Sequence, residues 1–157
     1  MNDGKPKKIK IRDAKPRDVG LFNKLWKAYL ESNEKLGAAI TTSDRNLAMP
    51  QFLFEQYVSR KLSGIVLFVA DYAVLMAGEG ASPIDYNCGK VAIIWGVHVQ
   101  DGKDDGVGAE IVQTALRMLK QQGFDSILTT YAAQNEALPK LLPNAKSMYV
   151  TALVPLE

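Results

Sequence analysis

The sequence lacks most of the features that mark secreted, membrane-spanning or polyanion-coating proteins. Its 157 residues include one cysteine, Cys88, so an internal disulfide framework is excluded and a reducing compartment is expected. No apolar run approaches the roughly eighteen residues of a membrane span, and the polar start has no apolar signal segment. The net charge is only +2, which argues against a protein that coats nucleic acid. We therefore expect a cytoplasmic protein with no membrane partner.

The sequence does contain enough apolar residues for one well-buried core. Hydrophobic residues make up 47% of the chain, which suits a single domain of this length. We expect a basic polar tail over residues 1–8 and one domain over residues 9–157. The basic cluster could dock on nucleic acid, but a solvated tail is the favoured interpretation. Its members are Lys5, Lys7, Lys8, Lys10 and Arg12.

Hydrophobic periodicity predicts a strand and then two helices. Ile9 and Ile11 alternate with charged residues, as in a strand exposed on one side. Apolar pairs spaced by four predict a helix from Asp18, whose carboxylate caps its free N–H groups, to a stop at Gly37. Residues 38–47 form a polar linker in this interpretation. Pro50 then opens a second helix that ends near Gly64.

Compact apolar runs predict the rest of a sheet. Runs that are apolar on both faces indicate strands covered on both sides. The predicted strands span residues 65–71, 73–79, 91–100, 126–131 and 147–154. A helix follows Gly108 and ends at Gly123, and a short segment covers residues 136–142. Meandering strands followed by a strand–helix–strand crossover predict an α/β fold, with a mixed sheet of six to seven strands and helices on both faces.

The loop between the third core strand and the long helix carries the clearest chemical signal. The first turn of a helix leaves about four N–H groups unpaired and carries roughly half a positive charge. Glycines let a ligand approach the backbone closely, so a diphosphate can settle on those groups. Gly106, Gly108 and the small Ala109 suit this role.

The element order and this loop resemble the GNAT (Gcn5-related N-acetyltransferase) superfamily. The stretch Lys103–Ala109 is similar to the family's acyl-CoA signature, Arg/Gln-x-x-Gly-x-Gly/Ala, at the same place after a strand and before a helix. Residues 9–19 look like the first strand and helix start of the family. Gly123-Phe124 with residues 126–130 resembles the exit into the fifth strand, and Asn135 lies where the family often has an asparagine.

The resemblance implies transfer of an acyl group, acetyl by default, from coenzyme A to a primary amine. Backbone groups of Val97 and Val99 would bind the pantetheine arm. The other implied cofactor-binding residues are Lys103, Asp105, Gly106, Val107, Gly108, Ala109 and Asn135. No metal is implied. The identity of the amine acceptor lies in variable loops and is left open.

Two departures from the family pattern weaken this expectation. Asp104 and Asp105 bring negative charge to the place where phosphates would bind, and like charges repel. Alternatively, one aspartate caps the helix itself and takes the hydrogen bonds that a phosphate would take. The segment that often carries a proton-donating tyrosine holds leucines here, and Pro139 confines any helix there to a turn or two.

Two residues are candidates for the general base. His98 lies on the strand that leads to the loop, opposite in orientation to Val97 and Val99. An ordinary hydrogen-bonded strand histidine is the alternative. Glu79 ends an apolar strand, and its alternative is an exposed hairpin carboxylate.

The sequence thus leaves two functions open. One is an acyl-CoA-dependent N-acyltransferase. The other is a catalytically degenerate GNAT-fold protein that acts as a structural or binding module, for which a phage particle is one setting and a virion-associated location would follow. A homo-oligomer or larger assembly is compatible with both.

Overall fold

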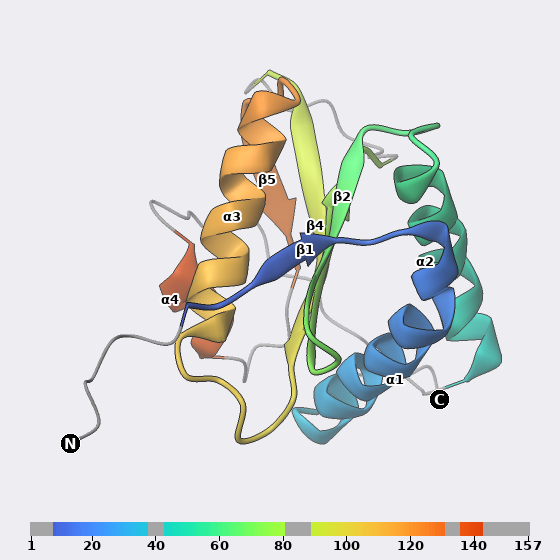
Figure 1. Cartoon of the computed structure of the whole chain (residues 1–157), viewed down its shortest axis with the longest axis vertical. Helices are drawn as coiled ribbons and strands as arrows, with labels where there is room; N and C mark the ends of the chain where they lie inside the picture. Colours follow the sequence, from blue (N-terminus) through green and yellow to red (C-terminus); the bar gives the residue numbers. More distant parts are fainter. Residues whose placement is uncertain (1–7, 38–42, 81–88, 131–135, 143–157) are drawn as a thin grey trace, which may run out of the picture.

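A mixed sheet with helices on both faces forms the framework of the protein (Figure 1). The computed structural model describes residues 8–37, 43–80, 89–130 and 136–142, and all structural statements concern these residues. In chain order the elements are β1 (Ile11–Asp13), a 3₁₀ turn (Pro16–Asp18), α1 (Val19–Lys35), α2 (Asp44–Val58), β2 (Gly64–Val69), β3 (Ala73–Gly78), β4 (Val91–Val99), α3 (Val107–Gln121), β5 (Ser126–Thr129) and α4 (Ala137–Leu141).

The strand order of the sheet follows the chain, β1-β2-β3-β4-β5. The first four strands pair antiparallel, and β5 pairs parallel to β4 after the α3 crossover. This confirms the predicted mixed α/β fold. The described residues contain five strands, against the six to seven predicted, and the predicted strand 147–154 lies outside them. No helix among the described residues is both long and apolar enough to cross a membrane.

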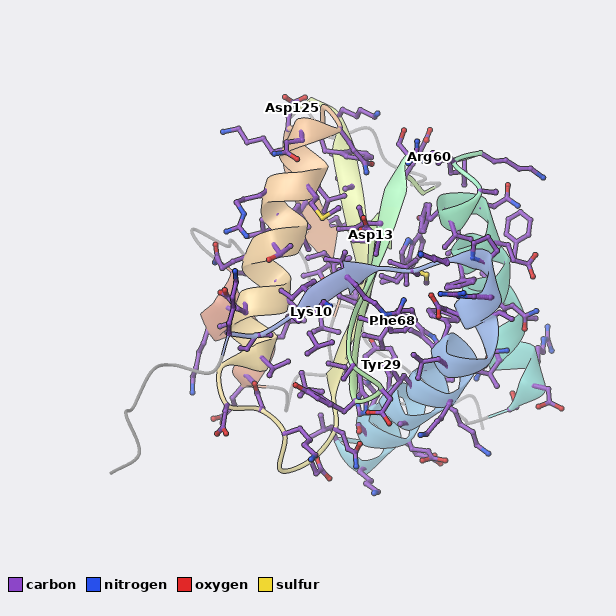
Figure 2. All side chains as sticks on the ribbon, viewed as in Figure 1. Lys10, Asp13, Tyr29, Arg60, Phe68 and Asp125 are labelled. Atoms are coloured by element: carbon purple, nitrogen blue, oxygen red, sulfur yellow. The ribbon has the colours of Figure 1, made fainter. Side chains whose placement is uncertain are left out.

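Two apolar layers hold the helices to the sheet. Alternate residues of β2 and β3 point to opposite faces, so Leu67 and Leu75 pack towards α3 while Phe68 and Met76 pack towards α1 and α2. Figure 2 shows these layers filled with side chains, with Phe68 labelled. Each such side chain contributes roughly 1.5–3 kcal/mol through burial. Covering on both sides explains why both strands are apolar throughout.

Helix α1 follows its predicted stripe. Phe22, Leu25, Trp26 and Leu30 are buried against the sheet and α2. The helix ends at Lys35, and Gly37 has a φ of 80°, which a residue without a Cβ adopts without strain. The predicted helix and its stop are confirmed.

The predicted role of Asp18 as a side-chain cap of α1 is wrong. Its carboxylate instead accepts from the Lys15 N–H at 2.7 Å and from the Arg12 guanidinium at 2.7 and 3.1 Å. The guanidinium also lies 5.1 Å from the centre of the Phe68 ring. Asp18 therefore fixes β1 and the 3₁₀ turn rather than the helix start. It also engages Arg12, one member of the basic cluster.

Helix α2 begins earlier than the sequence indicated. Residues 44–47, expected in the polar linker, are helical, and Pro50 lies inside the helix rather than at its first position. Ser43 Oγ accepts from the Asn46 N–H at 3.4 Å, and Asp44 adds an acidic residue to the first turn. A hydrogen-bonding serine and an acidic residue at the start of a helix stabilise that start more than Pro50 hinders it.

We expect Asp18→Asn to destabilise the protein in a pH-dependent manner. The Arg12 hydrogen bonds hold the pKa of Asp18 below the ordinary carboxyl value of 3.8. A lowered folded-state pKa stabilises the fold above the unfolded pKa, and this stabilisation disappears as the pH falls through the folded value. Urea denaturation should show a deficit of about 1 kcal/mol at pH 7 that disappears as the pH falls through the lowered pKa of Asp18. Asp71→Asn, in the exposed turn after β2, should show no such deficit.

Candidate functional site

The parallel pairing between β4 and β5 stops halfway along β4. It covers four residue pairs and ends with Ile94 opposite Thr129. At this last pair, Thr129 Oγ1 donates to the Ile94 carbonyl at 3.2 Å. β4 continues to Val99 against β3, but residues 95–99 have no β5 partner among the described residues. Among the described residues, one side of β4 therefore has no strand neighbour there.

A β-bulge lies at the point where this pairing ends. Met76 pairs with Gly96 and Ala77 pairs with Ile94, so Trp95 is the extra residue on β4. A Cβ added to Gly96 would come within 2.7–2.9 Å of the rings of Trp26 and Tyr29. The glycine is therefore required for the close approach of α1 to the bulge.

The backbone of Val97 and Val99 faces the open side of β4. The Gln100 N–H donates to the Tyr72 carbonyl next to β3 at 2.8 Å. In an antiparallel pair, the N–H and C=O of one residue point to the same side, and successive residues alternate. Val97 and Val99 therefore direct these groups away from β3, while their side chains pack in the α3-side layer.

The start of α3 has the predicted glycine geometry but is capped from within the chain. Gly106 precedes the helix with a φ of 76°, and a Cβ on it would meet nothing within 4 Å. Val107 and Gly108 are buried in the first turn. Asp104 Oδ1 accepts from the Gly108 N–H at 2.9 Å, as the capping alternative predicts. Because Asp104 is exposed, its side chain has room to leave this position.

The remaining loop residues lie around this helix start with different surroundings. Lys103 Nζ lies 6.0 Å from the centre of the Tyr72 ring, and the Asp105 N–H donates to the Lys103 carbonyl at 3.1 Å. Ala109 is exposed on the first turn of α3. Asn135, predicted to contact the cofactor, lies outside the described residues.

His98 is half-buried on the face of the sheet covered by α1 and α2. It pairs with Val74, whose side chain belongs to the layer on that face. Burial lowers the pKa of His98, and nearby Asp101 partly opposes this. The imidazole is therefore mainly neutral at pH 7 and able to accept a proton.

Glu79 lies far from His98. Gly78, just before Glu79, pairs with Ile93, five positions from His98 on β4, which corresponds to roughly 16 Å. The exposed Glu79 carboxylate accepts from the Ser63 N–H at 3.3 Å. The structure does not bring the two candidate bases together, and Glu79 resembles the exposed hairpin carboxylate of the alternative interpretation.

Two tyrosines, one on α1 and one on α2, bind the bulge residue. Trp95 Nε1 donates to Tyr57 Oη at 2.8 Å, and Tyr57 Oη donates to the Glu79 carbonyl at 2.5 Å. Tyr29 Oη donates to the Trp95 carbonyl at 3.3 Å. Burial raises the pKa of Tyr57 to about 12 and also raises that of Tyr29. The glycine inside the strand, Gly96, was the sequence signal for this close packing.

The segment after β5 offers no tyrosine in its described part. α4 spans five residues, includes Pro139 and buries Leu138, which confirms the predicted short helix. Leu141 lies beside Gly108 at the start of α3, 3.6 Å from a Cβ added there. Tyr131 and Tyr149, the nearby tyrosines in sequence, lie outside the described residues.

The sequence matches no protein-family model and no curated protein. Solved structures do resemble the chain. One is the BH1408 protein from Bacillus halodurans, solved as a tetramutant, with a TM-score of 0.71 and 19% identity over 94% of this chain and 100% of that chain. Another is an aminoglycoside N-acetyltransferase in complex with CoA, with a TM-score of 0.64 and 14% identity over 97% of each chain. A third is a ribosomal-protein-alanine N-acetyltransferase from Brucella melitensis biovar Abortus 2308, with a TM-score of 0.60 and 12% identity over 96% of this chain and 100% of that chain.

These likenesses establish the fold. The mixed sheet, the α3 crossover and the helix layers are those of the GNAT acetyltransferases. At 12–19% identity the likeness extends to architecture and not to individual residues.

We expect Tyr57→Phe to destabilise the protein by about 1–3 kcal/mol. The change removes one hydroxyl and leaves both the Trp95 N–H and the Glu79 carbonyl without this partner. Urea denaturation followed by tryptophan fluorescence measures the effect. Tyr72→Phe is the matched control and should stay within about 0.5 kcal/mol of the parent. Equal effects of the two changes would contradict the assigned role of Tyr57.

Proposed function

We propose that the protein is an acyl-CoA-dependent N-acyltransferase that transfers an acyl group, acetyl in the simplest case, to a primary amine. The observation that carries the proposal is the end of β4–β5 pairing at Ile94. It leaves the backbone groups of Val97 and Val99 directed to an open side that leads to the start of α3. The GNAT fold supports the same function.

The residues around this opening suit an acyl-CoA molecule. Backbone groups of Val97 and Val99 would hold the amide-containing pantetheine arm, as a neighbouring strand would. The N–H groups at the start of α3, from Val107 to Ala109, would hold the pyrophosphate, helped by the helix dipole and by Lys103. Asp104 has to leave the Gly108 N–H for the phosphate to use it. The bound acyl-CoA supplies an activated thioester.

Catalysis in this proposal depends on positioning. A neutral amine held beside the thioester attacks it directly, the new C–N bond forms, and the C–S bond breaks as the thiolate leaves. His98 is the candidate acceptor for the amine proton, because burial keeps its imidazole neutral. Glu79 lies roughly 16 Å from His98 along the strand direction, so we assign it no part in this step.

The self-capped helix supports a second function, that of a non-catalytic binding module on the GNAT fold. Asp104 already supplies the negative charge and the acceptor that the Gly108 N–H would find in a phosphate. A chain that no longer binds acyl-CoA would retain such a cap at little cost. The two functions differ in whether acetyl-CoA stabilises the protein.

We expect acetyl-CoA to raise the thermal midpoint. A ligand in hundredfold to thousandfold excess over its dissociation constant stabilises a protein by about 3–4 kcal/mol, which corresponds to several degrees. Differential scanning fluorimetry with millimolar acetyl-CoA measures the shift. No shift in either the parent or Asp104→Asn would exclude the transferase and leave the binding module.

Asp104→Asn should enlarge the shift produced by acetyl-CoA. The amide oxygen still accepts from the Gly108 N–H, but the charge that repels the phosphates is gone. We expect about fivefold tighter binding by calorimetry, the equivalent of one like-charge contact in water. Asp105→Asn is the control, since its carboxylate makes no hydrogen bond to the α3 start in the described residues, and its effect should be smaller. Weaker binding by Asp104→Asn would contradict competition at this amide.

A further inference from the structure

A hollow lies between α1 and α2, which run side by side over one face of the sheet (Figure 1). Its volume is about 450 Å³. None of its described lining residues is basic, and two are acidic. The lining consists of Asn23 from α1 with Asp44, Leu47, Ala48, Gln51, Phe52 and Glu55 from α2.

The polar groups of the hollow are arranged as hydrogen-bond acceptors. Asn23 Nδ2 donates to Gln51 Oε1 at 3.1 Å, and Gln51 Nε2 donates to Glu55 Oε1 at 3.4 Å. One N–H of Asn23 and one N–H of Gln51 thus take part in a chain of hydrogen bonds that ends at the Glu55 carboxylate. Asn23 Oδ1 is buried and has no hydrogen-bond partner among the described residues. Because solvent does not reach this oxygen, the acceptors that a ligand in the hollow can meet are the exposed carboxylates of Asp44 and Glu55, which favour a ligand that donates hydrogen bonds.

The two carboxylates lie at opposite ends of the hollow. Asp44 begins α2 and Glu55 follows eleven residues later, which separates them by roughly 16 Å along the helix axis. Leu47, Ala48 and Phe52 provide apolar surface between them. Phe52 is 51% exposed, which leaves much of its ring available at the surface of α2. Along α2, the hollow therefore presents a negative charge, then an apolar surface, then a second negative charge.

We propose that this hollow binds a linear aliphatic polyamine. One ammonium would lie at Asp44 and another at Glu55. The methylene segments would lie on Leu47, Ala48 and Phe52, and the aromatic ring adds a face that attracts cations. Anionic ligands are repelled by both carboxylates. This inference is independent of acyl transfer, since every residue it uses lies on α1 or α2.

Calorimetric titration with spermidine as the probe, at low ionic strength, tests the proposal on the full chain. Asp44→Asn and Glu55→Gln should each weaken binding about fivefold, because each removes one exposed charge contact. Glu31→Gln, an exposed carboxylate on α1 outside the hollow, removes the same charge and should leave the affinity unchanged. Propylamine, with a single ammonium, should bind at least tenfold more weakly than spermidine.

Several outcomes would overturn the proposal. Equal weakening by Glu31→Gln would show a general charge effect, and equal binding of propylamine would remove the bridging of the two ends. Absence of spermidine binding would end it outright. Nuclear magnetic resonance provides a readout that does not depend on variants, because spermidine should shift the side-chain amide signals of Asn23 and Gln51. Shifts confined to other parts of the chain would contradict the site.

Discussion

The extra residue that Trp95 adds to β4 is the constraint on which the candidate site depends. A bulge leaves one residue outside the strand ladder, so other groups must hold it. Tyr29 on α1 binds the Trp95 carbonyl and Tyr57 on α2 binds its indole N–H, so both helices of one layer fix the same point. Gly96 lets α1 approach closely enough for this. The part of β4 that has no β5 partner among the described residues begins at this anchored residue.

The start of α3 is the second feature on which the candidate site depends. Its positive electrostatic potential would favour an external anion and also favours a carboxylate of the chain itself. The same N–H groups and dipole that would attract a pyrophosphate also attract the Asp104 carboxylate. A side-chain cap of this kind contributes roughly 0.5–2 kcal/mol. Displacing it would weaken a ligand by a factor of roughly 2 to 30. Because Asp104 is exposed and not built into the core, its cap would lower the affinity of this helix start for an anion without closing the proposed site.

The sequence was most informative where local patterns and tertiary packing agree. The apolar stripe of α1, the fully apolar β3 and the Gly106 turn before α3 were all predictable, because each follows from periodicity or from the conformational freedom of glycine. The predicted start of α2 was wrong because it was placed at Pro50, a residue typical of the first helical position. The helix in fact begins directly after the Ser43 cap. The role of Asp18 was wrong because its partner, Arg12, was interpreted as part of a solvated tail. The bulge depends on register between strands, which no single segment encodes.

The environment of the tyrosines limits the chemistry that this site can perform. A general acid or base works best with a pKa near the working pH. Burial raises the pKa of Tyr57 to about 12, and its hydroxyl already donates to the Glu79 carbonyl. Burial likewise raises the pKa of Tyr29, whose hydroxyl already donates to the Trp95 carbonyl. Both tyrosines are therefore structural residues that hold the Trp95 bulge in place. Burial moves the pKa of His98 in the opposite direction, which favours the neutral imidazole that the proposed transfer would need as a proton acceptor. In the proposed transfer, the rest of the acceleration would come from holding the amine and the thioester together, and not from acid–base work by these tyrosines.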